Sequence, residues 1–180
     1  MTLRLVVTGS ECTGKTTLAR RLAAHLGAPW LAETSRAYAI ERLRQSRVLT
    51  AEDVEPIARL AMAAEDAALA GTPAILVLDT DLISTVVYAR HYYGACPSWI
   101  EAEARVRRGD QYLLCSPDLP WLADGVRDQP AARTAIHRRF QDALEEFEVS
   151  VTTVAGSGGA RDAIGVAVAA ALAAEAGAPS

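Results

Sequence analysis

The chain has 180 residues, of which 51% are apolar and 22% charged, a length and composition typical of one folded domain with a substantial core. No run of eighteen apolar residues occurs, so the sequence predicts no membrane-spanning helix. The formal net charge of −4 argues against an electrostatic nucleic-acid surface, and we expect neither membranes nor nucleic acids among its partners.

The cysteines and the start of the chain favour a cytoplasmic protein. Cys12, Cys96 and Cys115 are odd in number and scattered, which is typical of reduced thiols in a reducing compartment. None has the spacing of a metal-ligand pair, and the chain begins with a strand pattern rather than a signal peptide. We therefore expect a single cytoplasmic domain over residues 1–180 that binds a small-molecule substrate; a homo-oligomer is compatible with the sequence.

The first segment with a strong signal is a strand followed by a glycine-containing loop and a helix. Residues 3–7 are an apolar, β-branched run, residues 9–16 read Gly-Ser-Glu-Cys-Thr-Gly-Lys-Thr, and leucines recur every four residues from Leu18. Together they give the full context of a GxxxxGK[ST] P-loop, in which glycines let backbone N–H groups curl around a phosphate. Lys15 is expected to reach the β- and γ-phosphates, and the Thr16 hydroxyl to ligate Mg²⁺.

One compositional contrast supports this interpretation over a chance match to a glycine-containing turn. The chain has seventeen arginines and one lysine, and that lysine is Lys15. The sequence therefore keeps a lysine at the one position where a compact ammonium is needed and the planar guanidinium of an arginine would not serve. The predicted ATP-binding residues are Gly9, Glu11, Thr13, Gly14, Lys15, Thr16, Thr17 and Arg161.

Strands and helices alternate along the rest of the chain. Apolar runs bounded by turn residues predict further strands at 30–32, 74–78, 111–115 and 149–154. Helical patterns lie between them, at 33 to about 47, 50 to about 70, 82 to about 93, 97 to about 108, 130 to about 147 and after 159. The predicted fold is an α/β P-loop NTPase of the nucleoside and nucleotide kinase kind, a five-stranded parallel sheet with helices on both faces.

Acidic residues follow the second and third predicted strands, at the sheet edge where ligands bind in open α/β folds. Asp79 ends the most apolar strand, where a Walker-B-type acid holds Mg²⁺, and this role is favoured over a helix N-cap. Glu33 is a candidate general base, or equally a partner of Arg36. Asp81 either contacts a substrate sugar or caps the next helix, and the sequence leaves both open.

A proline-rich stretch without periodicity, residues 116–129, is predicted to be a lid loop. It contains Arg127, with Arg133 just beyond it, and an arginine delivered by such a lid would stabilise the charge that spreads over a transferring phosphoryl group. Two solvated surface arginines are the alternative.

Aromatic residues give weaker signals. Trp30 and Trp121 lie near strand ends and either stack on a planar ring or pack in the core, the latter being commoner for a single tryptophan. Tyr88 and Tyr92 are four apart on one predicted helix and are expected to be packing residues.

Three segments together resemble a known family. They are Gly-Ser-Glu-Cys-Thr-Gly-Lys-Thr at 9–16, Leu-Asp-Thr-Asp at 78–81 and Pro-Trp-Leu-Ala-Asp-Gly-Val-Arg at 120–127. They are similar to the ribosylnicotinamide kinase domain of the bifunctional bacterial nicotinamide-nucleotide adenylyltransferase/ribosylnicotinamide kinase proteins. The resemblance implies ATP and Mg²⁺ as cofactors, with the metal near Thr16 and Asp79. It also implies a substrate region at Glu33, Arg36, Asp81, Trp121 and Asp124, and a catalytic set of Lys15, Glu33, Asp79 and Arg127.

Two functions from different classes are consistent with these features. The first is ATP-dependent phosphorylation of a nucleoside-like alcohol, nicotinamide riboside above all. The second is a nucleotide-dependent regulatory or binding ATPase module without a small-molecule acceptor. The acids at the strand ends and the lid arginine favour the first, because a switch needs no second substrate pocket. The acceptor itself is not identified by the residues.

Overall fold

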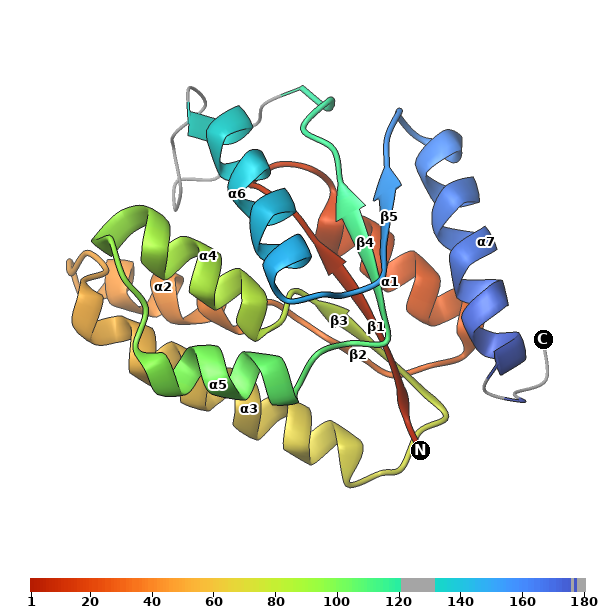
Figure 1. Ribbon diagram of the computed structural model, residues 1–180, viewed down its shortest axis with the longest axis horizontal. Coiled ribbons are helices and arrows are strands. Elements are labelled where there is room, and N and C mark those ends of the chain that lie inside the picture. Colours follow the sequence, from red (N-terminus) through yellow and green to blue (C-terminus); the bar gives the residue numbers. More distant parts are fainter. Residues whose placement is uncertain (121–131, 176, 178–180) are drawn as a thin grey trace.

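The centre of the fold is a sheet of five parallel strands in the order β2-β3-β1-β4-β5 (Figure 1). The computed structural model describes residues 1–120, 132–175 and 177. The central strand, β1, carries the P-loop at its carboxyl end, between β3 and β4. The strands are β1 (Leu3–Thr8), β2 (Trp30–Leu31), β3 (Ile75–Asp79), β4 (Gln111–Cys115) and β5 (Val151–Val154).

Helices cover both faces of the sheet, as Figure 1 shows. Because side chains alternate along a strand, Leu5 and Val7 face one helical layer and Val6 faces the other. One layer is formed by α1 (Lys15–Leu26) and α7 (Gly159–Glu175). The other is formed by α3 (Val54–Leu69), α4 (Leu82–Tyr93), α5 (Ser98–Val106) and α6 (Arg133–Glu146), with α2 (Thr34–Arg44) packed beside α3.

The predicted fold and element order are confirmed, and several predicted boundaries are wrong by a few residues. The second helix stops at Arg44 rather than about residue 47, because Ser46 takes a left-handed backbone conformation with φ of +55°. The third begins with a short 3₁₀ turn, η1 (Ala51–Asp53), whose capping box of Thr50 and Asp53 matches the predicted helix start. The predicted start of the sixth helix at Pro130 lies outside the described residues.

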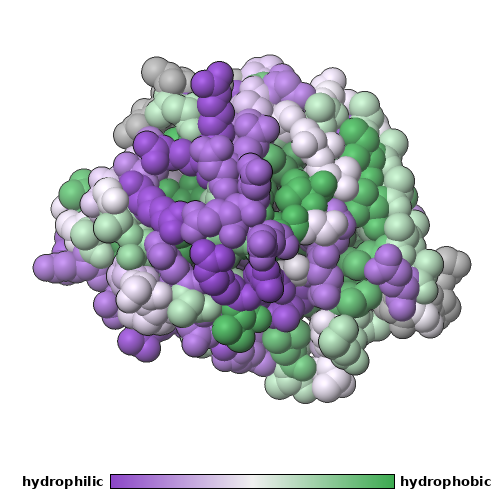
Figure 2. Space-filling view, in the orientation of Figure 1, coloured by the Kyte–Doolittle hydropathy of each residue, from purple (hydrophilic) through white to green (hydrophobic). Residues whose placement is uncertain are grey.

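The outer surface of α6 is strongly hydrophilic, and it forms the purple band over the middle of Figure 2. Inward-facing residues of this helix recur at helical spacing and are buried, whereas those between them are exposed. Within residues 1–120 and 132–175, no helix has both the length and the hydropathy needed to cross a membrane.

Candidate functional site

Two glycines of the P-loop occupy conformations that other residues rarely adopt. Gly9 has φ of +134°, and a Cβ at this position would lie 2.7 Å from the carbonyl oxygen of Cys115 at the end of β4. Gly14 has φ of +77° immediately before α1 begins. Such backbone allows successive N–H groups to line a concave site at a helix N-terminus. The loop therefore has the geometry that an anion cradle requires.

The single lysine lies inside this loop. The Lys15 side chain is only 7% exposed, and its Nζ donates to the Ser10 carbonyl oxygen at 2.8 Å. The Thr13 hydroxyl donates to the same oxygen, also at 2.8 Å. An ammonium has three donors, so two remain for a bound anion. Thr17 follows in the first turn of α1, where it is exposed.

Thr16 and Asp79 meet at the carboxyl ends of β1 and β3. The Thr16 hydroxyl donates to Oδ2 of Asp79 at 2.5 Å, and Asp79 is only 2% exposed. The second carboxylate oxygen, Oδ1, is buried and has no hydrogen-bond partner among the described residues. Burial raises the pKa of the Asp79 carboxyl, and the Thr16 hydrogen bond opposes that rise.

These two side chains fit a magnesium ion that is completed by phosphate and water. Mg²⁺ prefers oxygen ligands and is commonly held by one or two protein groups together with substrate phosphates. An orphaned buried carboxylate oxygen beside a hydroxyl, next to a P-loop, is that kind of partial site. Within the described residues no cluster of three or more His, Cys, Asp or Glu side chains offers an all-protein metal site.

A strained turn separates Asp79 from Asp81. Thr80 has φ of +71°, which is unfavourable for a β-branched residue, and its N–H donates to the Val7 carbonyl at 2.9 Å. Beyond it, Asp81 caps α4 by accepting from the Ser84 N–H at 3.4 Å. The cap is therefore Asp81 rather than Asp79, which leaves the Asp79 carboxylate for another role.

The Tyr112 hydroxyl also donates a hydrogen bond to Oδ2 of Asp81, at 2.6 Å. Burial raises the pKa of the Asp81 carboxyl to about 6, against the lowering effect of these hydrogen bonds. Asp81 also lines the neighbouring pocket. Its capping role therefore does not exclude the predicted contact with a substrate.

The raised pKa of Asp81 predicts a pH-dependent stability difference. The pKa of this carboxyl is about 6 in the folded protein and 3.8 in the unfolded chain. The carboxyl therefore stabilises the fold fully below pH 3.8, and this stabilisation is lost as the pH rises through about 6. In urea titrations over a pH series, the free energy of unfolding of wild type minus that of Asp81→Asn should fall between pH about 4 and about 6 and stay constant above about 7. Asp142→Asn, on the exposed face of α6, is the control. A difference independent of pH would contradict the expectation.

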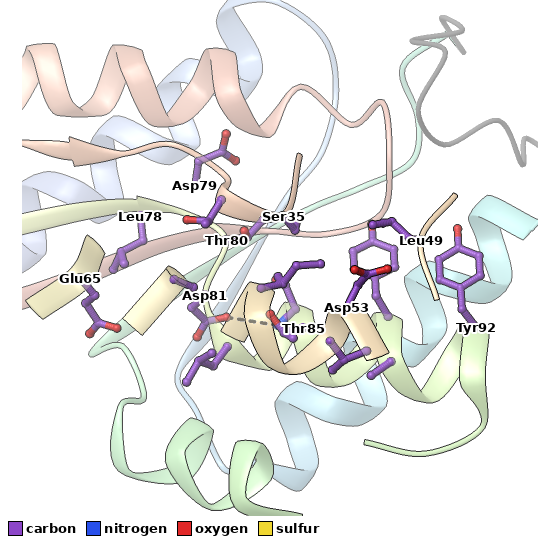
Figure 3. A pocket seen from close by; sticks show the side chains of 18 of the residues that line it. Ser35, Leu49, Asp53, Glu65, Leu78, Asp79, Thr80, Asp81, Thr85 and Tyr92 are labelled. Carbon is purple, nitrogen blue, oxygen red and sulfur yellow. Dashed lines mark hydrogen bonds between the residues drawn. The ribbon is translucent and has the colours of Figure 1, made fainter. Parts of the chain in front are cut away.

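A pocket opens beside the Asp79–Asp81 turn, with about 890 Å³ of empty space that is partly open to solvent. Figure 3 shows the turn at one end and Leu49 and Tyr92 at the other. Its floor is apolar, and its charged lining residues are all carboxylates: Asp53, Glu65, Asp79 and Asp81. Two of these have arginine partners, because Arg42 binds Asp53 and Arg4 binds Glu65. At the end near the P-loop, neither Asp79 nor Asp81 forms an ion pair with an arginine or lysine of the described residues.

Three tyrosines of α4 line this pocket: Tyr88, Tyr92 and Tyr93. The sequence predicted only a packing role for Tyr88 and Tyr92, and their place in the pocket was missed. Tyr88 does pack, edge-on against Phe140 with ring centroids 5.6 Å apart, but it also stacks with Tyr92 toward the pocket. The Tyr92 hydroxyl donates to Glu11 of the P-loop at 3.3 Å. A sequence signal exists, because positions 81, 85, 88 and 92 share one face of a helix.

Glu33 and Arg36 lie at the start of α2, near enough to Asp79 for their charges to act on it. Glu33 accepts the Ser35 hydroxyl at 2.7 Å. Its charge raises the pKa of Asp79, whereas the charge of Arg36 lowers it, so both act on the same carboxylate. Neither lines the pocket, although Thr34 and Ser35 between them do. Whether Glu33 is a base or a structural partner thus stays a prediction.

The two buried arginines near the P-loop bind protein groups. Arg161, predicted to bind ATP, is 6% exposed and donates to the carbonyls of Thr13, Ser116 and Gly156 at 2.6 to 2.8 Å and to the carboxylate of Asp118. Arg133 is 8% exposed, so the alternative of a solvated surface arginine is wrong for it.

The predicted lid and its neighbours are only partly described. Trp121, Asp124 and Arg127 lie outside the described residues, so their predicted roles stay predictions. Trp30 is described, and it packs against the core between the sheet, α1 and α7, with the Arg20 guanidinium 4.9 Å from its ring centroid. This matches the packing interpretation of that residue.

The family follows from a match over most of the chain. A family model described as an AAA domain matches residues 4–161. The chain belongs to this family. This AAA-domain protein is 27% identical over 144 residues to the trifunctional NAD biosynthesis/regulator protein NadR of Escherichia coli (strain K12), a match that covers 79% of the chain and 35% of the relative. The predicted resemblance is thereby confirmed.

Solved structures agree with the family. A crystal structure of NadR protein in complex with NR has a TM-score of 0.74 and 25% identity, covering 99% of this chain and 52% of that one. Thymidylate kinase from Ehrlichia chaffeensis has a TM-score of 0.67 at 13% identity, covering 95% and 98%, and at that identity it supports the fold alone. The AAA-domain chain thus spans about half of the NadR structure and about a third of the curated relative.

Proposed function

We propose that the protein transfers the γ-phosphoryl group of ATP to the primary hydroxyl of a nucleoside-like alcohol, with nicotinamide riboside as the acceptor and nicotinamide mononucleotide as the product. One observation carries the proposal: a pocket with tyrosine walls and only acidic charges opens at the carboxylates beside the P-loop. The pocket is partly open to solvent and lies directly beside the Asp79–Asp81 turn, so an acceptor bound in it would lie next to the P-loop.

The charges of the pocket favour a cationic ring. Nicotinamide riboside carries a pyridinium, and cations are stabilised by carboxylates and by aromatic faces. Asp81 forms no ion pair with an arginine or lysine within the described residues, whereas Asp53 and Glu65 do. Tyr88, a wall residue on α4, is placed to contact a planar group.

The P-loop side supplies the phosphate chemistry. Lys15, the backbone N–H groups of the loop and the N-terminus of α1 would hold the phosphates. Thr16 and Asp79 would hold Mg²⁺, which neutralises charge on the phosphate oxygens when bound. The Glu33 carboxylate is our candidate for taking the proton of the attacking hydroxyl, since Asp79 is committed to Thr16 and the metal.

The relationship to NadR supports this assignment. NadR is named as an NAD biosynthesis and regulator protein, and one NadR structure is a complex with NR. The two proteins share the fold, and the acceptor is our inference from the pocket.

The test compares two forms of one nucleoside. ADP release is measured with nicotinamide riboside, with its reduced, uncharged dihydro form, with a panel of other nucleosides, and without acceptor. We expect kcat/KM for nicotinamide riboside to exceed that for the dihydro form by about 10- to 100-fold, the range for a charge-assisted contact. ATP hydrolysis that no acceptor increases would contradict the proposal and favour the regulatory ATPase module.

A further inference from the structure

Two arginines from different helices hold the outer side of the P-loop. Arg133, at the start of α6, donates through Nη2 to the carbonyl oxygen of Cys12 at 3.0 Å and through Nη1 to that of Leu119 at 2.8 Å. Arg161, in the first turn of α7, donates through Nη1 to the carbonyl oxygen of Thr13 at 2.8 Å. Both side chains are less than a tenth exposed, so these bonds are protected from water.

The bonds fix the orientation of two consecutive peptide planes. In a trans peptide the C=O and the following N–H point in opposite directions. A carbonyl of Cys12 held outward by Arg133 therefore turns the N–H of Thr13 inward, and a carbonyl of Thr13 held by Arg161 does the same for the N–H of Gly14. These N–H groups belong to the loop that cradles phosphate in this motif.

The loop needs such support because its conformation is intrinsically unfavourable. Cys12 has φ of +53°, a left-handed conformation that is unfavourable for a residue with a Cβ. The carbonyl of Ser10 is held separately, by Lys15 and Thr13. A peptide flip at residues 12 or 13 would point a carbonyl, rather than an N–H, at the phosphate.

We propose that Arg133 and Arg161 are positioning residues that hold the P-loop amides ready for the phosphates of the nucleotide. The inference rests on the proposed function only in requiring that this loop binds the phosphates of ATP. Arg161 acts through the loop rather than by direct contact, because its Nε, Nη1 and Nη2 already donate to Gly156, Thr13, Ser116 and Asp118.

The test measures phosphate affinity without any acceptor. Calorimetry gives the Kd of wild type for Mg²⁺-ATP and for inorganic tripolyphosphate, and the same values for Arg133→Ala and Arg133→Lys. We expect both Kd values to rise about 10- to 100-fold in Arg133→Ala, the range for one lost charge-assisted hydrogen bond. Arg133→Lys should recover only part, because an ammonium lacks the fork that spans two carbonyls.

A matched arginine separates positioning from general stability. Arg90 bonds Glu101 and Glu146 on α5 and α6, away from the P-loop, so Arg90→Ala should lower Tm and leave both Kd values unchanged. A second readout is the ¹H–¹⁵N spectrum, in which tripolyphosphate should shift the amides of Thr13 and Gly14 in wild type and not in Arg133→Ala.

Arg161→Lys serves as the second variant should Arg133→Ala fail to fold, and the same rise in both Kd values is expected from it. Unchanged Kd values in a folded Arg133 or Arg161 variant, with only Tm lowered, would overturn the proposal. If the kinase reaction with nicotinamide riboside fails but these Kd changes appear, the positioning role stands without the proposed acceptor.

Discussion

Replacing Lys15 with alanine is expected to lower kcat for phosphoryl transfer by at least about 10²- to 10³-fold, the range for losing one preorganised charge at a developing anion. The Lys15 ammonium is buried within the loop, and no other lysine exists in the chain to substitute for it. The loss should fall on kcat more than on KM for the acceptor, because the charge on the phosphoryl oxygens grows toward the transition state.

Lys15→Arg is the informative companion to that variant. It keeps the charge but brings a planar fork into a space where the Nζ is held 2.8 Å from the Ser10 carbonyl. We expect it to be nearly as inactive as Lys15→Ala, with an unchanged circular dichroism spectrum as evidence of folding. Turnover of Lys15→Arg near that of wild type would show that the charge alone suffices and that the lone lysine has no special role.

The phosphate side of the site was predictable because its signals are local. The P-loop depends on the spacing of glycines and of Lys15 within eight residues, and Asp79 is marked by the apolar strand before it. Thr50 with Asp53 marks a helix start by a capping pattern three residues long, and the structure has that pattern. Each of these is encoded by neighbours in sequence.

The acceptor side was less predictable because it depends on which way a helix face turns. Tyr92 and Asp53 come from segments that only the folded protein brings together. No short sequence motif therefore indicates that they line the same pocket. The role of Arg133 depends on the register of α6, whose buried positions include 133, 136, 137 and 140. That spacing was readable in the sequence, but the carbonyls that Arg133 meets, on Cys12 and Leu119, were not.

Removing the charge of Asp79 should separate activity from stability. Asp79→Asn keeps the shape of the side chain, so the fold should persist, while the carboxylate that we assign to Mg²⁺ is lost. We expect kcat to fall by about 10²- to 10³-fold and the Mg²⁺ concentration for half-maximal rate to rise, as for loss of one electrostatic group at a metal-assisted centre. Asp142→Asn, exposed on α6, should change neither quantity.

The direction of the stability change follows from the pKa of Asp79. Burial raises this pKa above the ordinary 3.8, so the contribution of the carboxyl to stability is complete below 3.8 and is lost as pH rises through the raised value. At pH 7 the buried carboxylate therefore costs stability, and the Tm of Asp79→Asn should equal or exceed that of wild type. The advantage should shrink toward pH about 4, where the wild-type carboxyl gains its proton. A variant unfolded at room temperature, or one with an unchanged Mg²⁺ dependence, would mean that Asp79 serves the fold and not the metal.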